Sequence, residues 1–422
     1  MIKLYYRIKD KLFYGWLVVL AFFIINIIAQ GTRFSFGVFF KALASEFGLT
    51  RAETSGVYSV YMLLSCILGI VSGWAADKFS LRILMSLMGL FTGLSLILTS
   101  QAHSLWHLFV VYSFLLAIGT SGVFIVSTSI IIRWFNSKRG FAIGLATSGI
   151  GLGTTVMAPF AAYLIATLGW RMSFIVMGII SWLFIIPMAL LLRKEPSEMG
   201  LLPYGAESNG GKTGGSNGAE GSNQSTGFSP SAAFQTRNFW YLCFSWLLYS
   251  LCLFMVFTHI VPHGTDTGIS AMKAATILSV IGGMDIPGRL LVGKISDSAG
   301  RKAMAITCAL CLAGAIIWLI YSKELWMFYL FAVVFGFCSG GLSTSSTALA
   351  GDIFGQISIG IIIGTLNAGW FLGAAIGPFI GGLVYDISNN YSLAFSMSVA
   401  AMLLVTLFLA LTKRETILDR RT

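Results

Sequence analysis

Residues 281–301, IGGMDIPGRLLVGKISDSAGR, are the stretch on which the interpretation of the whole chain depends. Its first half is apolar, yet it contains Asp285 and Arg289, four residues apart. Residues i and i+4 of a helix lie on the same face, so this acid and this base can form an ion pair. Ionisable side chains inside a membrane-spanning helix are costly and usually serve a function. We therefore interpret this stretch as the centre of a binding site inside a membrane.

The composition supports a membrane setting. Of the 422 residues, 56% are hydrophobic and only 10% are charged, whereas a soluble domain has about 25% charged residues. Apolar runs long enough to cross a bilayer recur along the whole length. The net charge of +11 does not indicate nucleic acid, because the Lys and Arg residues cluster between apolar runs, as the positive-inside rule predicts. The sequence predicts an all-α, multi-pass membrane protein with the lipid bilayer as its surroundings.

The chemistry of an enzyme is missing from the sequence. No nucleophilic triad and no phosphate-binding GxxxxGK[ST] motif is present, so neither hydrolysis nor ATP-driven pumping has a site. The six cysteines lie inside apolar runs without zinc-site spacing. We therefore expect no enzymatic activity, no metal and no cofactor.

Twelve membrane-spanning helices are expected, six on each side of a polar segment. That segment, residues 193–236, contains the Gly/Ser-rich run GAESNGGKTGGSNGAEGSNQSTG, which is typical of a flexible linker. It separates a half at 1–192 from a half at 237–422. The expected spans are 14–40, 53–76, 83–101, 105–133, 140–166, 171–192, 238–262, 271–295, 303–321, 325–350, 359–385 and 391–412.

The basic residues give the orientation. They fall on one side of the membrane if both termini are cytoplasmic, and the opposite loops are poorer in Lys and Arg. The positive-inside rule therefore places both termini in the cytoplasm. The residues on that side are Lys78, Arg82, Arg133, Lys138, Arg139, Arg193, Lys194, Arg301, Lys302, Lys413 and Arg414.

An internal repeat relates the two halves. Gly73 and Asp77 of the first half return as Gly293 and Asp297 of the second half, with one constant offset in numbering. Two separate segments that share one offset indicate duplicated halves in parallel orientation. A run of glycines has the same offset: Gly140, Gly144, Gly149 and Gly153 correspond to Gly360, Gly364, Gly369 and Gly373.

These loops, GWAADKFSLR at 73–82 and GKISDSAGRK at 293–302, resemble the cytoplasmic signature of the major facilitator superfamily, and the resemblance covers the whole chain. More narrowly, the chain resembles the branch of monocarboxylate transporters and oxalate/formate antiporters. The stretches that carry this resemblance are YGW at 14–16, GTRFSFGVFFKAL at 31–43, RWFNSKRG at 133–140, GWR at 169–171, HIVPHGTDTGIS at 259–270 and GGMDIPGRLLVGKISD at 282–297.

The resemblance assigns roles to the charged residues of the eighth span. In this family an Arg there pairs with the substrate carboxylate, and in proton-coupled members an Asp one turn earlier takes part. Arg289 and Asp285 match that pattern. We expect a proton on Asp285 to release Arg289 for the substrate anion, the alternative being a permanent structural ion pair. Similar proton-coupled animal proteins have a Lys in the first span, where this chain has Phe34, with Arg33 as the nearest cation.

Several other residues are candidates, each with an alternative role. Arg33 attracts the carboxylate or anchors its helix at the membrane surface. His259 takes part in proton coupling or is an ordinary interfacial residue. Asn26 and Asn367 bind substrate oxygen or join helices. Trp370 is expected to shape the substrate pocket. The oxalate exchanger has a second cation, a Lys, at the matching position, and the absence of that cation here favours a cargo with one carboxylate.

The charged loops are expected to act as gates rather than to touch substrate. Asp77, Arg82, Asp297 and Arg301 lie at helix ends on the cytoplasmic side. Ion pairs and helix-terminus contacts there can hold the outward-open state and break when the inner side opens. Because the pattern occurs in both halves, we prefer this role to one in membrane orientation alone.

The sequence thus predicts a monomeric secondary transporter in the cell (inner) membrane. Its expected partners are a small organic anion of the lactate or pyruvate type and a proton, carried in symport by alternating access. The alternatives are an exchanger of oxalate, formate or another organic acid, and a membrane sensor that binds a carboxylate without moving it.

Overall fold

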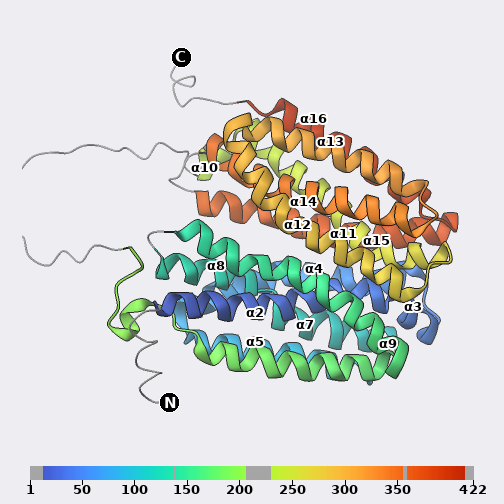
Figure 1. Ribbon diagram of the computed structural model, residues 1–422, viewed down its shortest axis with the longest axis horizontal. Helices are drawn as coiled ribbons and strands as arrows, with labels where there is room; N and C mark the ends of the chain where they lie inside the picture. The colour runs from blue at the N-terminus through green and yellow to red at the C-terminus, as the bar shows by residue number, and fades with distance from the viewer. Residues whose placement is uncertain (1–12, 136–137, 206–229, 355–358, 414–422) are drawn as a thin grey trace, which may run out of the picture.

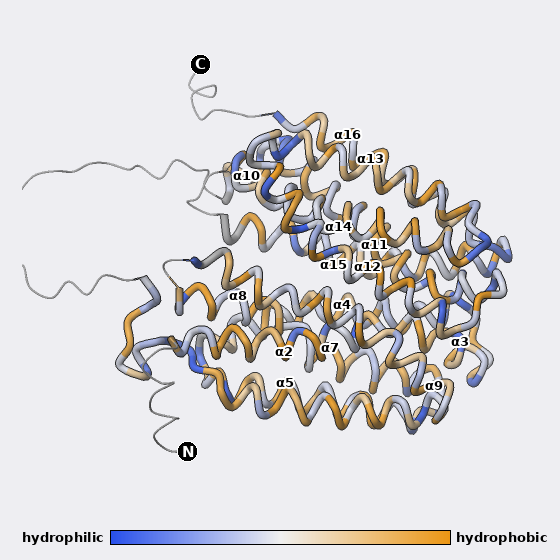
Figure 2. Tube along the Cα trace, in the orientation of Figure 1, coloured by the Kyte–Doolittle hydropathy of each residue, from blue (hydrophilic) through white to orange (hydrophobic). Residues whose placement is uncertain are grey.

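The structure is a computed structural model, and it describes residues 13–135, 138–205, 230–354 and 359–413. Within these ranges the regular structure is helical, apart from one isolated bridge between Phe135 and Tyr204. The long helices lie side by side along one axis (Figure 1). Hydrophilic residues gather at the two ends of the bundle, and hydrophobic residues fill the length between them (Figure 2). This distribution is the one that a bilayer requires of its spanning helices.

The first group of helices comes from the part of the chain that ends at Leu191. It consists of α2 (Tyr14–Phe34), α3 (Phe36–Phe47), α4 (Arg51–Lys78), α5 (Leu81–Thr99), α6 (Leu105–Leu108), the π-helical turn η1 (Phe109–Phe114), α7 (Leu115–Thr120), α8 (Val123–Trp134) and α9 (Arg139–Leu191).

The second group follows a short connecting part. After η2 (Pro196–Met199) and α10 (Pro230–Phe234) come α11 (Arg237–Asp266), α12 (Ala271–Ala299), α13 (Arg301–Ile320), α14 (Leu325–Phe354), α15 (Ile359–Ser388) and α16 (Ser392–Leu411). The described chain begins and ends on the same side of the bundle (Figure 1). We call that side the terminal end and the opposite side the distal end.

Eleven described helical stretches are long and apolar enough to cross a membrane, where twelve are expected from the sequence. The difference lies in α9, whose apolar stretch Phe141–Leu191 has 51 residues, about twice the length that a bilayer needs. Gly169 interrupts it with φ 77° and ψ 164°, a conformation that glycine adopts readily. The sequence predicts a connection over residues 167–170, and the structure confines the break to this single residue.

The duplication seen in the sequence is also present in the packing of helices. A side chain at Gly149 of α9 would meet the carbonyl oxygen of Phe23 in α2, and one at Gly369 of α15 would meet that of Cys243 in α11. Phe23 and Cys243 are themselves related by the offset that relates the two glycines. The next turn repeats the arrangement, with Gly153 on Ile27 and Gly373 on Leu247. Both halves therefore use glycine to bring the same two helices into close contact.

Only part of the expected linker, residues 193–236, belongs to the described structure. Residues 206–229, most of its Gly/Ser-rich run, lie outside the described residues. The part before them packs against the first group, where Tyr204 lies 5.3 Å from the ring of Phe13 and 5.6 Å from that of Phe135. An aromatic side chain supplies the apolar contact that the Gly/Ser-rich run lacks. The segment packed on the first group therefore extends past residue 192 to Tyr204.

Candidate functional site

Asp285 and Arg289 form the ion pair that their spacing predicts. Nε of Arg289 lies 2.6 Å from Oδ2 of Asp285, one turn apart on α12. The Arg289 side chain is 43% exposed and that of Asp285 17%. Among the described residues, the two Nη groups of Arg289 have no hydrogen-bond partner. The pair is therefore accessible, and the guanidinium keeps donors available for a second anion.

Close packing of α12 against α14 holds this pair. A side chain at Gly340 of α14 would lie 3.0 Å from the backbone nitrogen of Arg289, and one at Gly288 would meet the backbone of Phe337. The two helices thus touch through their backbones, which small residues permit in membranes. Larger residues at either glycine would push away the segment of α12 that carries the pair.

Aromatic side chains lie beside the pair. Tyr249 of α11 is near enough to Asp285 and Arg289 to interact with both charges, and its hydroxyl donates to the carbonyl oxygen of Ser339 at 2.7 Å. The ring of Trp370 in α15 stands edge-on to Tyr249 with centroids 5.3 Å apart. Trp370 therefore contacts the tyrosine that lies beside the ion pair.

Arg33 lies elsewhere, at the end of α2. Its Nη1 donates to Oε1 of Gln30 at 3.2 Å, and its Nη2 lies 3.1 Å from the sulfur of Met62. Its Nε is buried and has no hydrogen-bond partner among the described residues. Phe254 of α11 reaches Arg33 from the second group of helices, with its ring centroid 5.2 Å from the guanidinium carbon. The same Phe254 ring lies 5.9 Å from Trp370, so aromatic contacts connect Arg33 with the surroundings of Arg289.

The two candidate asparagines differ in their surroundings. Asn26 is fully buried, and its amide nitrogen donates to the carbonyl oxygens of Phe22 in α2 and Ala146 in α9. These contacts join two helices of the first group, although Oδ1 of Asn26 has no partner among the described atoms. Asn367 is partly exposed, one turn from Trp370, and donates to its own helix at Ile363. Asn367 is therefore the better placed of the two for contact with a ligand.

The distal ends of the two groups are joined by a set of ion pairs that the sequence analysis does not identify. Asp266, at the end of α11, lies 2.6 Å from Nζ of Lys41 and 2.8 Å from Nη2 of Arg51. Asp386 of α15 accepts hydrogen bonds from the backbone nitrogens of Arg51 and Ala52, at 2.9 and 2.8 Å. A carboxylate at a helix N-terminus is stabilising, so Asp386 ties α15 to the start of α4. We call Lys41, Arg51, Asp266, Asp386 and Tyr391 the distal latch.

His259, the second candidate for proton coupling, belongs to the surroundings of this latch. Its Nε2 lies 2.8 Å from the carbonyl oxygen of Pro378, which can only accept, so Nε2 carries the hydrogen. Its Nδ1, 3.1 Å from the hydroxyl of Tyr391, then accepts from that hydroxyl. Burial raises the pKa of Tyr391, which keeps this hydroxyl protonated, and Arg51 donates to the same oxygen. The structure thus places His259 with the distal latch and gives it no contact with Asp285.

No local sequence signal identifies which residues pair in the distal latch. Arg51 and Asp266 are 215 residues apart, and the backbone of Arg51 and the Asp386 carboxylate 335. Each residue alone looks like a solvated charge at the end of a span. The one usable signal is the position of Arg51 directly after the Thr50 cap of α4. The first turn of a helix has free backbone N–H groups, which favour an acidic side chain from another helix.

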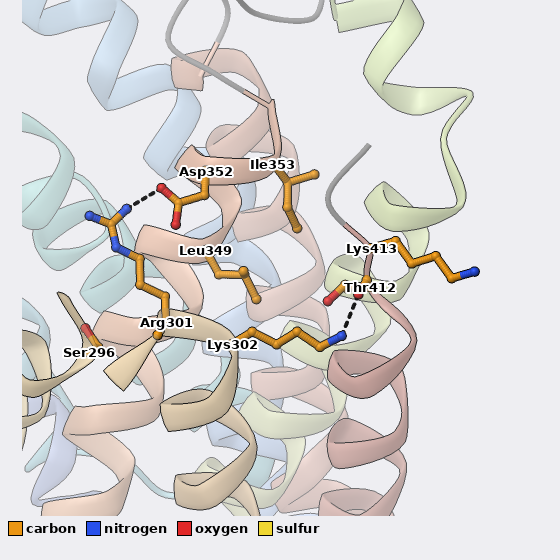
Figure 3. A pocket seen from close by; sticks show the side chains of 9 residues that line it. Ser296, Arg301, Lys302, Leu349, Asp352, Ile353, Thr412 and Lys413 are labelled. Carbon is orange, nitrogen blue, oxygen red and sulfur yellow. Dashed lines mark hydrogen bonds and ion pairs between the residues drawn. The ribbon is translucent and has the colours of Figure 1, made fainter. Parts of the chain in front are cut away.

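The charged loops at the terminal end form contacts within each group. Arg301 lies 2.6 Å from Oδ1 of Asp352 in α14, and Arg82 donates to the carbonyl oxygen of Leu192 at 3.1 Å. The side chains of Asp77 and Asp297, the other two expected gate residues, lie outside the described part. Arg301 and Asp352 are among the residues that line a pocket of about 590 Å³ (Figure 3).

Comparison with known proteins agrees with this architecture. The model of the Major Facilitator Superfamily matches residues 22–323 and 296–421. Monocarboxylate transporter 12 of Xenopus laevis is 23% identical, over 95% of this chain and 89% of that protein. Monocarboxylate transporter 13 of Bos taurus is 26% identical, over 92% of this chain and 87% of that protein.

The fold is also found among solved structures. A bacterial homolog to the human lysosomal transporter Spinster, in an inward-facing and occupied conformation, has a TM-score of 0.73 at 16% identity, over 94% of this chain and 96% of that chain. Its unoccupied form gives a TM-score of 0.71. Since the family model covers nearly the whole chain, the chain is a multi-pass membrane transporter and not an enzyme. It belongs to the Major Facilitator Superfamily, and the relatives it resembles are in the branch named monocarboxylate transporters.

Proposed function

We propose that this protein is a secondary active transporter of a small monocarboxylate, of the lactate or pyruvate type, which it carries together with a proton. The observation that supports the proposal is the accessible Asp285–Arg289 ion pair inside α12. A carboxylate accepts the proton and a guanidinium binds the anion, so one helical turn supplies both functions. The names of the relatives support the class of cargo.

The ion pair gives the coupling mechanism. A proton that binds Asp285 removes its charge and frees the Arg289 guanidinium. The freed guanidinium then binds the cargo carboxylate with two parallel hydrogen bonds. When the cargo and the proton leave, the ion pair with Asp285 forms again and the empty carrier returns. Because a proton and a monocarboxylate cross together, each cycle moves no net charge.

The topology follows from α9 and the basic residues. If the chain reverses at Gly169, the spans number twelve and both termini lie on one side. Basic residues at the terminal end, among them Arg82, Arg133 and Lys302, favour the cytoplasm for that side. The two halves of a monomer in the cell (inner) membrane then rock about the central site. In this assignment the structure has its distal, outer end closed by the distal latch.

Other residues complete the proposed site. Asn367 and Trp370 line it from α15, and Arg33, whose Nε has no hydrogen-bond partner among the described atoms, contributes a cation from the first half. The polar contacts of Asn26 favour helix packing, and those of His259 favour the distal latch. Asp77, Arg82, Asp297 and Arg301 gate the terminal end. Of these, Arg301 is paired within its own half while the distal end is closed.

Uptake of labelled lactate into liposomes that contain the purified protein tests the proposal. We expect an inward proton gradient to stimulate uptake at least tenfold, and a membrane potential alone to have no effect. Arg289→Gln should abolish uptake. Arg171→Gln is the matched control, because it breaks an ion pair with Glu46 outside the site, and it should keep uptake. The proposal fails if the proton gradient stimulates uptake of neither lactate nor pyruvate.

The same experiment recognises the two alternatives. The first alternative is an exchanger, in which Asp285 stays ionised and paired with Arg289 and is never protonated. Uptake would then require a preloaded anion inside the liposomes and ignore the proton gradient. A sensor would bind lactate without any uptake.

A further inference from the structure

His259 lies where the two halves meet near the distal end, and its side chain is fully buried. Phe40 of α3, from the first half, stands edge-on to the imidazole with ring centroids 5.3 Å apart. Another face is covered by α15, where a side chain at Gly381 would lie 2.7 Å from Cδ2 of His259. The ring is therefore enclosed while the halves are in contact, and Phe40 moves away from it when they separate.

A chain of hydrogen bonds connects this imidazole with the first half. Arg51 donates to the hydroxyl of Tyr391, and this hydroxyl donates to Nδ1 of His259 at 3.1 Å. Nε2 of His259 donates to the carbonyl oxygen of Pro378 at 2.8 Å. Only a neutral imidazole has one accepting and one donating nitrogen. The chain of hydrogen bonds therefore requires neutral His259, and it ends on Arg51 of the other half.

A proton on Nδ1 breaks this chain of hydrogen bonds. The imidazolium has two donors and no acceptor, so the Tyr391 hydroxyl loses the group that accepts its hydrogen. The imidazolium and the Arg51 guanidinium then both direct N–H groups at one phenol oxygen, and their positive charges repel each other. Protonation of His259 therefore weakens the hydrogen bond between Tyr391 and Arg51.

The charged groups around His259 are already engaged in the closed state. The nearest cations, Arg51 of α4 and Lys41 of α3, both pair with Asp266. The carboxylate of Asp386 accepts from the start of α4. A buried cation without an anion of its own is costly, so the closed distal end favours neutral His259. The other titratable groups near it are the phenols of Tyr385 and Tyr391 and the imidazole of His263.

Opening of the distal end removes this restriction. Once the halves separate, water reaches the imidazole, and a hydrated histidine takes up a proton at about pH 6.5. A group that binds a proton in only one of two states shifts the equilibrium toward that state as the pH falls. Acid therefore favours the open distal end. The ratio of open to closed protein should be about tenfold higher at pH 5.5 than at pH 7.5.

From this geometry we propose that His259 is a proton-binding site of the open distal end, and that its protonation releases the distal latch through Tyr391 and Arg51. The inference rests on the proposed function in one respect, namely that the distal end faces the outside. In an inward proton gradient the carrier then opens toward the acidic side, where it takes up cargo. The proton on His259 returns to that side when the distal end closes, so only the proton on Asp285 is transported.

Amide hydrogen exchange at the start of α4 tests this proposal without any cargo. The backbone nitrogens of Arg51 and Ala52 donate to Asp386 of the second half, so their protection reports the closed distal end. The protection factor divides out the intrinsic pH dependence of exchange. For the wild-type protein in nanodiscs, we expect it to fall about tenfold from pH 7.5 to pH 5.5. An unchanged protection factor would overturn the proposal.

Substitution of His259 should remove this pH dependence. His259→Gln keeps a donor for Pro378 but takes up no proton, so the fall should stay below about twofold. His259→Asn, whose amide oxygen replaces the accepting Nδ1, serves if the first variant does not fold. His103→Gln is the matched control, because His103 is an exposed histidine between α5 and α6, and it should keep the tenfold fall. A tenfold fall in the folded His259 variant would overturn the assignment.

Two further variants exclude other sites for the proton. His263→Gln should keep at least half of the fall on a logarithmic scale. If it abolishes the pH dependence and His259→Gln does not, the proton binds His263 and the proposal is wrong. Asp285→Asn should keep the whole fall, because Asp285 lies on α12 without contact to His259. Loss of the pH dependence in this variant would assign it to the central ion pair and contradict the proposal.

These outcomes separate the inference from the proposed function. If the wild-type protein transports no monocarboxylate, the proposed function is wrong, and the exchange measurement still decides the role of His259. If the protein transports lactate with a proton while its protection at the start of α4 ignores pH, only the role of His259 is wrong.

Discussion

The two ends of the helix bundle differ in which helices their ion pairs join. At the distal end, Asp266 of the second half binds Lys41 and Arg51 of the first half at 2.6 and 2.8 Å. At the terminal end, the described pairs Arg301–Asp352 and Arg133–Glu195 each lie within one half. Charges at the distal end therefore resist separation of the halves, whereas each of these pairs at the terminal end stabilises one half alone.

The apolar core shows the same difference. Phe36 and Tyr58, near the distal end of the first half, share one continuous buried cluster with Phe254 of the second half. Phe22 and Trp134, nearer the terminal end, belong to a separate cluster made only of residues of the first half. A transporter that is closed at one end and open at the other needs this asymmetry, because the contacts at the closed end must break in each cycle.

The largest effect on this asymmetry should come from Arg51→Ala. The substitution removes the ion pair with Asp266, the hydrogen bond to Tyr391 and the stacking on Tyr385 at 3.7 Å. Loss of such a largely buried pair costs about 2 kcal/mol, so the population open at the distal end should rise roughly 30-fold. Hydrogen exchange of amides at the start of α4, measured in nanodiscs, reports this opening. Exchange equal to that of wild type would show that Arg51 does not hold the distal end closed.

A smaller change is expected for Asp386→Ala. It removes the acceptors of two backbone N–H groups at the start of α4. The Thr50 cap and its capping box with Glu53 remain, so the loss is about 1 kcal/mol. Exchange at the start of α4 should rise about fivefold, and Asp386→Asn, which keeps one acceptor oxygen, should lie between. If Asp386→Asn and Asp386→Ala behave alike, the negative charge matters and the hydrogen bonds do not.

Lys41→Ala should have a small effect that depends on salt. Lys41 is 41% exposed, and exposed ion pairs contribute at most about 1 kcal/mol. We expect roughly a twofold rise in exchange at the distal end, which high salt should abolish. A change as large as that of Arg51→Ala would contradict the ranking by burial.

Asp352→Asn should leave the distal end unchanged. The ion pair with Arg301 connects α13 and α14 of the same half, so its loss should raise exchange only at the terminal ends of these two helices. Altered exchange at the start of α4 would show that this pair is coupled to the distal latch. That result would contradict the separation of the two ends drawn above.

Local patterns in the sequence predict much of this structure. The hydrophobic runs and the constant offset between the halves predict the helices and their repeated packing, because span length and helix contacts depend on nearby residues. Asp285 and Arg289 form the expected pair because four residues make one helical turn. The expected break at 167–170 contains Gly169, where the structure interrupts α9, although this break is shorter than expected.

Other features depend on tertiary structure and could not be predicted. The distal latch joins residues hundreds of positions apart, with no period that relates them. Asn26 is a polar residue in a span, but the rotation of α2 decides that it faces Ala146 of α9. The aromatic surroundings of Arg33 likewise depend on the position of α11 beside α2, which places the Phe254 ring near the guanidinium.

The central claim is that a proton on Asp285 releases Arg289 to bind the cargo carboxylate, and Asp285→Asn tests it most directly. The amide keeps the size of the side chain but cannot release a proton or form the ion pair. We expect this variant to lose the accumulation of lactate that a proton gradient drives, and to keep the exchange of internal for external lactate. Accumulation equal to that of the wild-type protein would contradict the account.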